Sequence, residues 1–95
     1  MIPSHRTATH PGLILLHEFL TPLDTTQSAL ARHLGVPVQR INEIVRGKRG
    51  ITADTAWLFA KALNTSPEFW LNLQAVHDLS LHKPTAVIKP IAVSA

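Results

Sequence analysis

Side chains that bind phosphates or base edges are concentrated in one short part of this 95-residue chain, from residue 32 to residue 49. That part carries five basic side chains against Glu43 alone, a local charge of +4, whereas the rest of the chain sums to −1. Basic side chains pair with phosphates, so this distribution predicts a phosphate-binding face. The five are Arg32, Arg40, Arg46, Lys48 and Arg49.

The elements that must position these side chains are two short helices and a tight turn, from Thr26 to Gly47. Ala31 is small where two helices would cross, and Gly35 permits the positive φ that ends the first of them. Ile41 then points back from the second helix into the space at the crossing. With Gln27 at the start, this ordered set predicts a helix-turn-helix, in which the second helix enters a DNA groove.

The whole chain is expected to be a single all-α domain of five helices. Capping residues, prolines and apolar periodicity predict where each begins and ends. The first helix starts at Pro11 or Gly12 and ends at Leu20, with Leu13, Leu16, Phe19 and Leu20 at helical spacing. The second lies between Thr26 and Gly35, and the third begins at Pro37 and closes at Gly47. The fourth runs from Thr52 to Asn64, and the fifth from Ser66 to about Ser80.

Helical spacing sorts the third helix into two faces. With Ile41 inward, Pro37, Ile44 and Val45 share its side. The outward residues are then Gln39, Asn42, Glu43 and Arg46, and the flanks carry Val38 and Arg40. Gln bonds adenine, Arg bonds guanine and Val touches a thymine methyl group. The candidates for base contacts are Val38, Gln39, Arg40, Asn42 and Glu43. The candidates for phosphate contacts are Gln27, at a helix N-terminus, and Arg46, Lys48 and Arg49.

A second interface is predicted on the fifth helix, which is apolar on more than one side. A helix in so small a domain hides one face in its own core, and the other apolar side favours a subunit contact. The residues assigned to this contact are Trp70, Leu71, Ala75, Leu79 and Leu81. A two-fold dimer would place two recognition helices roughly 34 Å apart, one turn of DNA.

The ends of the chain are expected to differ from the domain between residues 10 and 81. Residues 1–9 are predicted to form a flexible N-terminal arm. In residues 82–95, Pro84 and Pro90 oppose a helix, which leaves two interpretations. The tail is disordered, or its segment from Thr85 to Val93 is extended and pairs with a strand edge on another chain.

Composition excludes several function classes. The chain contains no cysteine, so disulfides and thiolate sites are absent. His17 and Glu18 begin like a zinc-protease HExxH motif, but Thr21 stands where the second histidine is required. No metal, cofactor or catalytic residue is predicted. Without an apolar run of about 20 residues or a signal-peptide core, the expected location is the cytoplasm.

Three segments resemble the HigA/VapI antitoxins, small members of the lambda-repressor-like, XRE-type helix-turn-helix superfamily. They are HPG at residues 10–12, INEIVRGKRGITADTA at 41–56 and SPEFWLNLQ at 66–74. The resemblance implies a five-helix fold and a homodimer that binds a palindromic operator and represses its own operon. It also implies a cognate HigB-like toxin partner, a RelE-like mRNA endonuclease that the antitoxin neutralises by binding.

Two alternatives remain open at this point. A stand-alone XRE-family repressor would have the same DNA-binding face and no toxin partner, and only SPEFWLNLQ argues against it. A protein-interaction module without DNA binding would show no loss of DNA affinity on charge reversal at Arg46 and Arg49. The sequence predicts neither the operator sequence nor the docking surface of the toxin.

Overall fold

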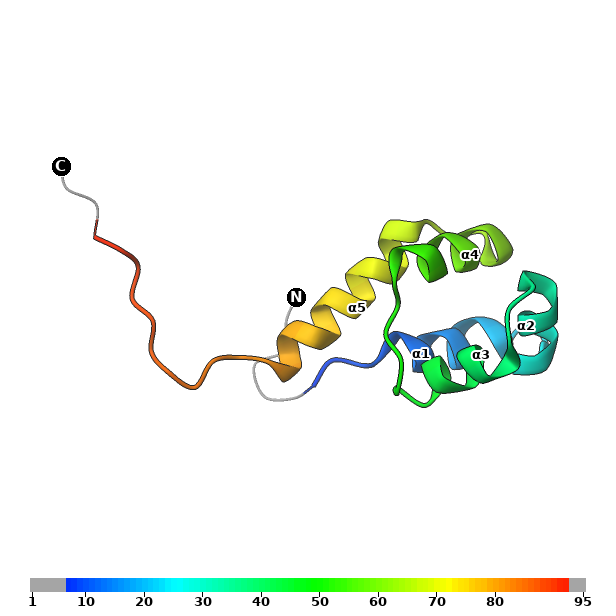
Figure 1. Cartoon of the computed structure of the whole chain (residues 1–95), viewed down its shortest axis with the longest axis horizontal. Helices are drawn as coiled ribbons and strands as arrows, with labels where there is room; N and C mark the ends of the chain where they lie inside the picture. The colour runs from blue at the N-terminus through cyan, green and yellow to red at the C-terminus, as the bar shows by residue number, and fades with distance from the viewer. Residues whose placement is uncertain (1–6, 93–95) are drawn as a thin grey trace.

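The computed structural model describes residues 7–92, and no β-strand occurs among them. Helices α1, α2 and α3 pack together, α4 lies to one side of them and packs against α5, and α5 runs from α4 towards the start of the chain (Figure 1). None of the helices between residues 7 and 92 is long and apolar enough to cross a membrane. The elements are α1 (Pro11–Ile14), η1 (Leu15–Leu20), α2 (Gln27–Leu34), α3 (Val38–Val45), α4 (Ala53–Leu63) and α5 (Pro67–Leu81).

The predicted caps define the helix boundaries. The hydroxyl of Thr26 accepts a hydrogen bond from the Ala29 N–H at 3.0 Å, and Ser66 caps α5 in the same way. Gly35 and Asn64 both adopt the left-handed conformation that ends a helix, with φ of 72° and 55°. The five predicted helices are therefore confirmed to within a few residues, because caps are local features.

The first helix differs from its prediction in its second half. After Ile14 it widens into the π-helical stretch η1, and the Thr21 N–H bonds to the Leu16 carbonyl five residues back at 2.9 Å. The wider turn changes which residues face inward: Leu15 and Leu20 are buried, whereas Leu13 is exposed. The expected α-helical stripe is wrong at Leu13 for this reason.

Trp70 lies at the centre of the core, which corrects its assignment to the subunit interface. Its side chain is 0% exposed, and its indole N–H donates to the Thr65 hydroxyl at 2.7 Å. Its ring packs against three phenylalanines, Phe19, Phe59 and Phe69. The inward face of α5 therefore starts at Trp70 and continues through the half-buried Leu73, Gln74 and His77. Two of these are polar, so apolar spacing could not identify that face.

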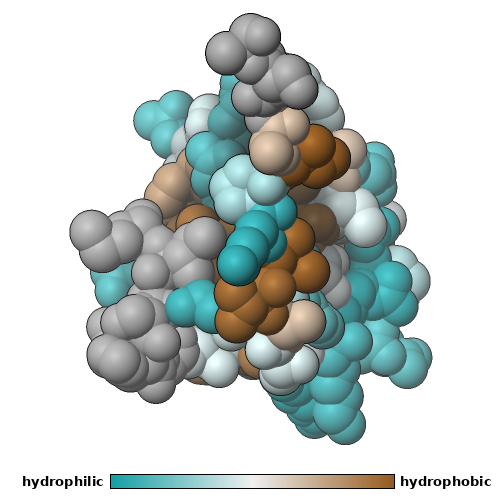
Figure 2. All heavy atoms as spheres, turned by 90° about the vertical axis from the view of Figure 1, so that its left-hand side faces the viewer, coloured by the Kyte–Doolittle hydropathy of each residue, from teal (hydrophilic) through white to brown (hydrophobic). Residues whose placement is uncertain are grey.

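The N-terminal end of the described chain is bonded to α5, whereas the C-terminal tail projects from the body. Residues 1–6 of the predicted flexible arm lie outside the described residues, but Ala8 is bonded to α5. Its N–H donates to Ser80 Oγ at 2.9 Å, and its carbonyl lies 2.7 Å from His77 Nδ1. The tail after α5 projects from the body without helix or strand, and apolar side chains gather on this end of the molecule (Figures 1 and 2).

Candidate nucleic-acid interface

Helix α3 is anchored by its apolar face and presents the opposite face to solvent. Ile41, Ile44 and Val45 are buried, as predicted, but Pro37 is exposed and precedes the first helical residue as its N-cap. Gly12 allows α1 to lie directly on α3, because a Cβ at this glycine would fall 1.8 Å from the Ile44 carbonyl oxygen. The outward residues are Val38 and Gln39, which are exposed, Asn42 and Glu43, which are half-buried, and Arg46, which is exposed.

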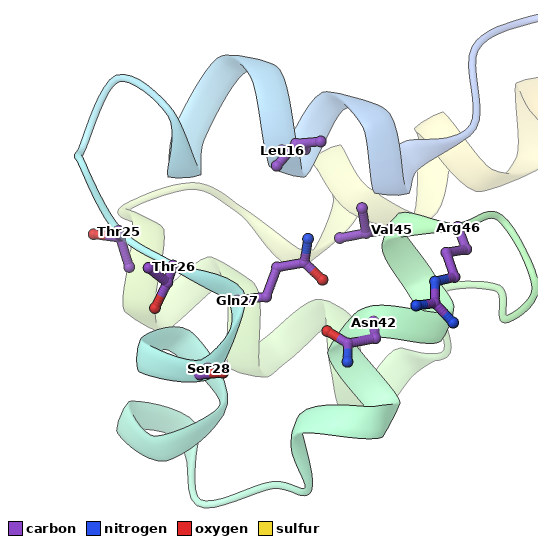
Figure 3. A pocket seen from close by; sticks show the side chains of 8 residues that line it. All are labelled: Leu16, Thr25, Thr26, Gln27, Ser28, Asn42, Val45 and Arg46. Carbon is purple, nitrogen blue, oxygen red and sulfur yellow. The ribbon is translucent and has the colours of Figure 1, made fainter.

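A hollow of about 440 Å³ opens between the start of α2 and the outer side of α3. The amides of Gln27 and Asn42 and the guanidinium of Arg46 border it together, while Leu16 and Val45 form apolar parts of its wall (Figure 3). The first turn of any helix has backbone N–H groups without an intrahelical acceptor, and its dipole favours an anion. The side-chain amides, the Arg46 guanidinium and the N-terminus of α2 can all donate hydrogen bonds to a phosphate bound in this hollow.

Glu43 and Arg49 form an ion pair on the other side of α3. Arg49 donates from Nε and Nη2 to one carboxylate oxygen of Glu43, at 3.0 Å and 2.7 Å. The pair borders a second hollow of about 390 Å³, which Pro37, Gln39 and Arg40 also line. The structure thus brings a predicted base contact and a predicted phosphate contact together, and Glu43 offsets part of the positive charge of Arg49.

Arg40, another predicted base contact, bonds to residues of α4. Its Nη2 donates to Asp54 Oδ2 at 3.0 Å and to the Thr55 hydroxyl at 2.6 Å, so its guanidinium is turned towards α4. Asp54 lies in the first turn of α4 and attracts the cation. Residue 40 lies on the flank of α3, as predicted, and a guanine contact would require its guanidinium to leave Asp54 and Thr55.

The basic loop, residues 46–50, follows α3 and carries the remaining predicted phosphate contacts. The backbone N–H groups of Lys48 and Arg49 both donate to the Glu43 carbonyl, at 2.8 Å and 3.2 Å, and Gly47 takes a φ of 75°. At its other end, the Ile51 N–H donates to Gln74 Oε1 of α5 at 2.7 Å. The loop is therefore fixed at both ends, with its basic side chains exposed.

Sequence reasoning missed three residues around this surface. Ser28 lines the first hollow, Asp54 holds Arg40, and Gln74 holds the basic loop. Ser28 could have been identified from the sequence, because it follows Gln27 in the first turn of a capped helix. The contacts of Asp54 and Gln74 join separate elements, and no local pattern indicates them.

Known proteins share this sequence and fold. A helix-turn-helix family model matches residues 16–70. Virulence-associated protein I of Dichelobacter nodosus is 47% identical over 74 residues, which span 78% of this chain and 68% of that protein. Antitoxin HigA-1 of Vibrio cholerae is 34% identical over 99 residues, which span 99% of this chain and 93% of that protein.

Solved structures of antitoxins match the fold as well as the sequence. The antitoxin HigA of Pseudomonas aeruginosa, solved with the higBA promoter, has a TM-score of 0.76 at 44% identity, over 78% of this chain and 80% of that one. This chain belongs to the HigA family of helix-turn-helix antitoxins. The resemblance seen in the sequence is confirmed, and HigA-family proteins are DNA-binding antitoxins and regulators rather than enzymes.

Proposed function

We propose that this chain is an antitoxin that binds the operator of its own operon as a homodimer and represses transcription by occupying the promoter. The hollow between α2 and α3 carries the proposal, because Gln27 and Arg46 converge there beside the outward face of α3. A phosphate in this hollow would fix α3 along the major groove. The structure of Pseudomonas aeruginosa HigA with the higBA promoter supports binding to promoter DNA.

The side chains divide into two groups in this proposal. Val38, Gln39, Asn42 and Glu43 face base edges, and each good contact discriminates against a wrong base by about 1–3 kcal/mol. Arg40 joins this group when its guanidinium leaves Asp54 and Thr55, and Glu43 when it leaves Arg49. The phosphate group consists of Gln27, Arg46, Lys48 and Arg49, whose contribution falls with increasing salt.

Charge reversal tests the proposed face. Arg46→Glu should weaken binding to the DNA upstream of the gene by about tenfold or more and should reduce the salt dependence, because each subunit then neutralises one phosphate fewer. Lys61→Glu on α4 makes the same change of charge outside the proposed face and serves as the matched control. Equal losses of affinity in the two variants would show that only the overall charge matters.

The proposed dimer uses an exposed apolar row along α5. Leu71, Ala75 and Leu79 follow one another at intervals of four residues, and Leu81 lies at the end of the helix. The three leucines are 37%, 53% and 52% exposed, which is unusual for large apolar side chains of one helix. Burying this row against a second copy would present two α3 helices to one face of the DNA.

The second part of the proposal concerns a protein partner. Membership of the HigA family supports a HigB-like toxin, a RelE-like mRNA endonuclease that the chain neutralises by binding in the cytoplasm. The test is co-expression of the tagged chain with the neighbouring reading frame, followed by purification and mass analysis. A small basic partner at fixed stoichiometry, toxic when expressed alone, is expected. Absence of any such partner, with operator binding retained, would indicate a stand-alone repressor.

A further inference from the structure

Gln74, on the inward face of α5, is the only described side chain that hydrogen-bonds the backbone at the downstream end of the basic loop. Its Oε1 accepts from the Ile51 N–H at 2.7 Å, and Ile51 itself is 5% exposed. The bond joins residues 23 positions apart. It therefore fixes the loop through tertiary structure, whereas the upstream end depends on the local bonds to the Glu43 carbonyl.

A second hydrogen bond, made by the nitrogen of the Gln74 side-chain amide, fixes the orientation of that amide. Its Nε2 donates to Asp78 Oδ1 one turn further along α5, at 2.8 Å. With the nitrogen held by Asp78, the oxygen must point to the loop. The amide also lies flat against Gly50, since a Cβ at that glycine would fall 3.2 Å from Gln74 Cδ and Oε1. A continuous series of contacts thus runs from Asp78 through the Gln74 amide to Gly50 and Ile51.

We propose that Gln74 is a positioning residue for DNA binding, which holds the basic loop so that Lys48 and Arg49 meet the phosphates. This inference rests on the proposed function. Gln74 itself touches no DNA and acts only through the loop. It also connects the proposed dimer helix to the DNA-binding face, because α5 carries the apolar row on its outward side and Gln74 on its inward side.

Loss of the acceptor is the first test. Gln74→Leu leaves the buried Ile51 N–H without a partner and frees the loop. We expect binding to weaken by about tenfold for the DNA upstream of the gene and for a scrambled duplex alike, because phosphate contacts carry no sequence information. The slope of log affinity against log salt should fall by about one for each phosphate that is no longer neutralised. Asn72→Ala, at an exposed position of the same helix, is the control.

A double variant separates positioning from a general role in stability. Gln74→Glu combined with Asp78→Asn exchanges the two polar groups without changing the net charge. The carboxylate introduced at position 74 then accepts from both the Ile51 N–H and the amide introduced at position 78, so the connection is rebuilt. We expect this variant to restore affinity and salt slope to within about twofold of the original values. Gln74→Glu alone places two carboxylates together and should bind less well.

Amide hydrogen exchange of Ile51 completes the experiment. It should be faster in Gln74→Leu and return to its original rate in the double variant. Unchanged exchange, or faster exchange with unchanged DNA affinity, would overturn the proposal. If Gln74→Leu fails to fold, Asp78→Ala keeps the acceptor but releases its orientation, and should show faster exchange with a smaller loss of affinity. A wild-type chain that binds neither duplex would contradict the proposed function. The exchange rates would still test whether Gln74 holds the Ile51 N–H.

Discussion

His10 and Gly12 determine how closely the start of α1 approaches the DNA-binding half of the protein. Gly12 lies against the α3 backbone at a distance that excludes any side chain. His10 caps α1, accepting the Gly12 N–H at its Nδ1 over 2.9 Å, and its ring meets His77 edge-on at 4.8 Å. The HPG motif therefore supports the position of the recognition helix.

Gly12→Ala should destabilise the protein strongly. Its Cβ would meet backbone atoms of Ile44 and Val45, which cannot rotate away, so α1 must separate from α3. We expect a loss of about 3 kcal/mol in the free energy of unfolding, at the upper end of overpacking costs. Urea denaturation measures it, and a loss below about 0.5 kcal/mol would contradict the described packing of α1 on α3.

The His10 side chain should make stability dependent on pH. Burial, and then the neighbouring His77, lower the pKa of His10 below its ordinary 6.5, although Asp78 opposes the shift. The unfolded chain therefore takes up a proton more readily, so stability is complete above about pH 6.5 and is lost as the pH falls below it. Thermal unfolding between pH 5 and 8 should show this decrease.

A neutral cap at position 10 is the matched variant. His10→Asn keeps an N-cap acceptor without a titrating group and should reduce the pH dependence. His17→Asn removes an exposed histidine elsewhere and is the control. If His10→Asn and the original protein lost stability equally on acidification, the assignment to His10 would be wrong.

Single residues were predicted well where their role is local. Gly35 and Ile41 were identified because the turn and the crossing impose their types. Trp70 was misplaced and the contacts of Arg40 were not foreseen, because their partners include residues of other helices: Phe19 and Phe59 for Trp70, Asp54 and Thr55 for Arg40. Residue type alone does not distinguish an exposed Trp from a central one.

Helices were predictable from their ends more than from their faces. The caps at Thr26 and Ser66 fixed the starts of α2 and α5. The π-helical widening of η1 was not predictable, since an i−5 bond depends on packing with the rest of the fold. The polar inward face of α5 was missed because Gln74 and His77 replace the apolar residues that periodicity detects.

The two caps provide a matched pair of variants. Thr26→Ala and Ser66→Ala should each cost about 1 kcal/mol of stability, since each removes a side-chain acceptor at a helix start. Only Thr26→Ala should also weaken DNA binding, because Thr26 lines the proposed phosphate hollow. Urea denaturation and a DNA titration measure the two effects. Equal effects on DNA binding would argue against the hollow as a phosphate site.

At the scale of the whole molecule, the two proposed surfaces lie on different elements. They are connected by the hydrogen bond between Gln74 of α5 and Ile51 at the end of the basic loop. In the proposal, DNA meets α2, α3 and the basic loop, while the second subunit meets the outward row of α5. The sequence indicated both surfaces through charge clustering and excess apolar surface. It did not indicate that Gln74 joins them, because that bond exists only after folding.

Leu79→Asp should convert the protein to a monomer, since it places a charge in the centre of the proposed subunit contact. Size-exclusion chromatography with light scattering at micromolar concentration measures the mass. Leu23→Asp changes another exposed leucine, outside α5, and should leave a dimer. A monomeric original protein would contradict the dimer directly.

In the proposed mode of binding, this chain recognises a specific DNA sequence through α3. The most direct test is a titration with the DNA upstream of its own gene and with a scrambled duplex of equal length, at several salt concentrations. We predict binding to the upstream DNA that is tighter by about 10³-fold or more, and Gln39→Ala should reduce this ratio while Lys48→Ala weakens both duplexes equally. Equal affinity of the original chain for the two duplexes would contradict the claim.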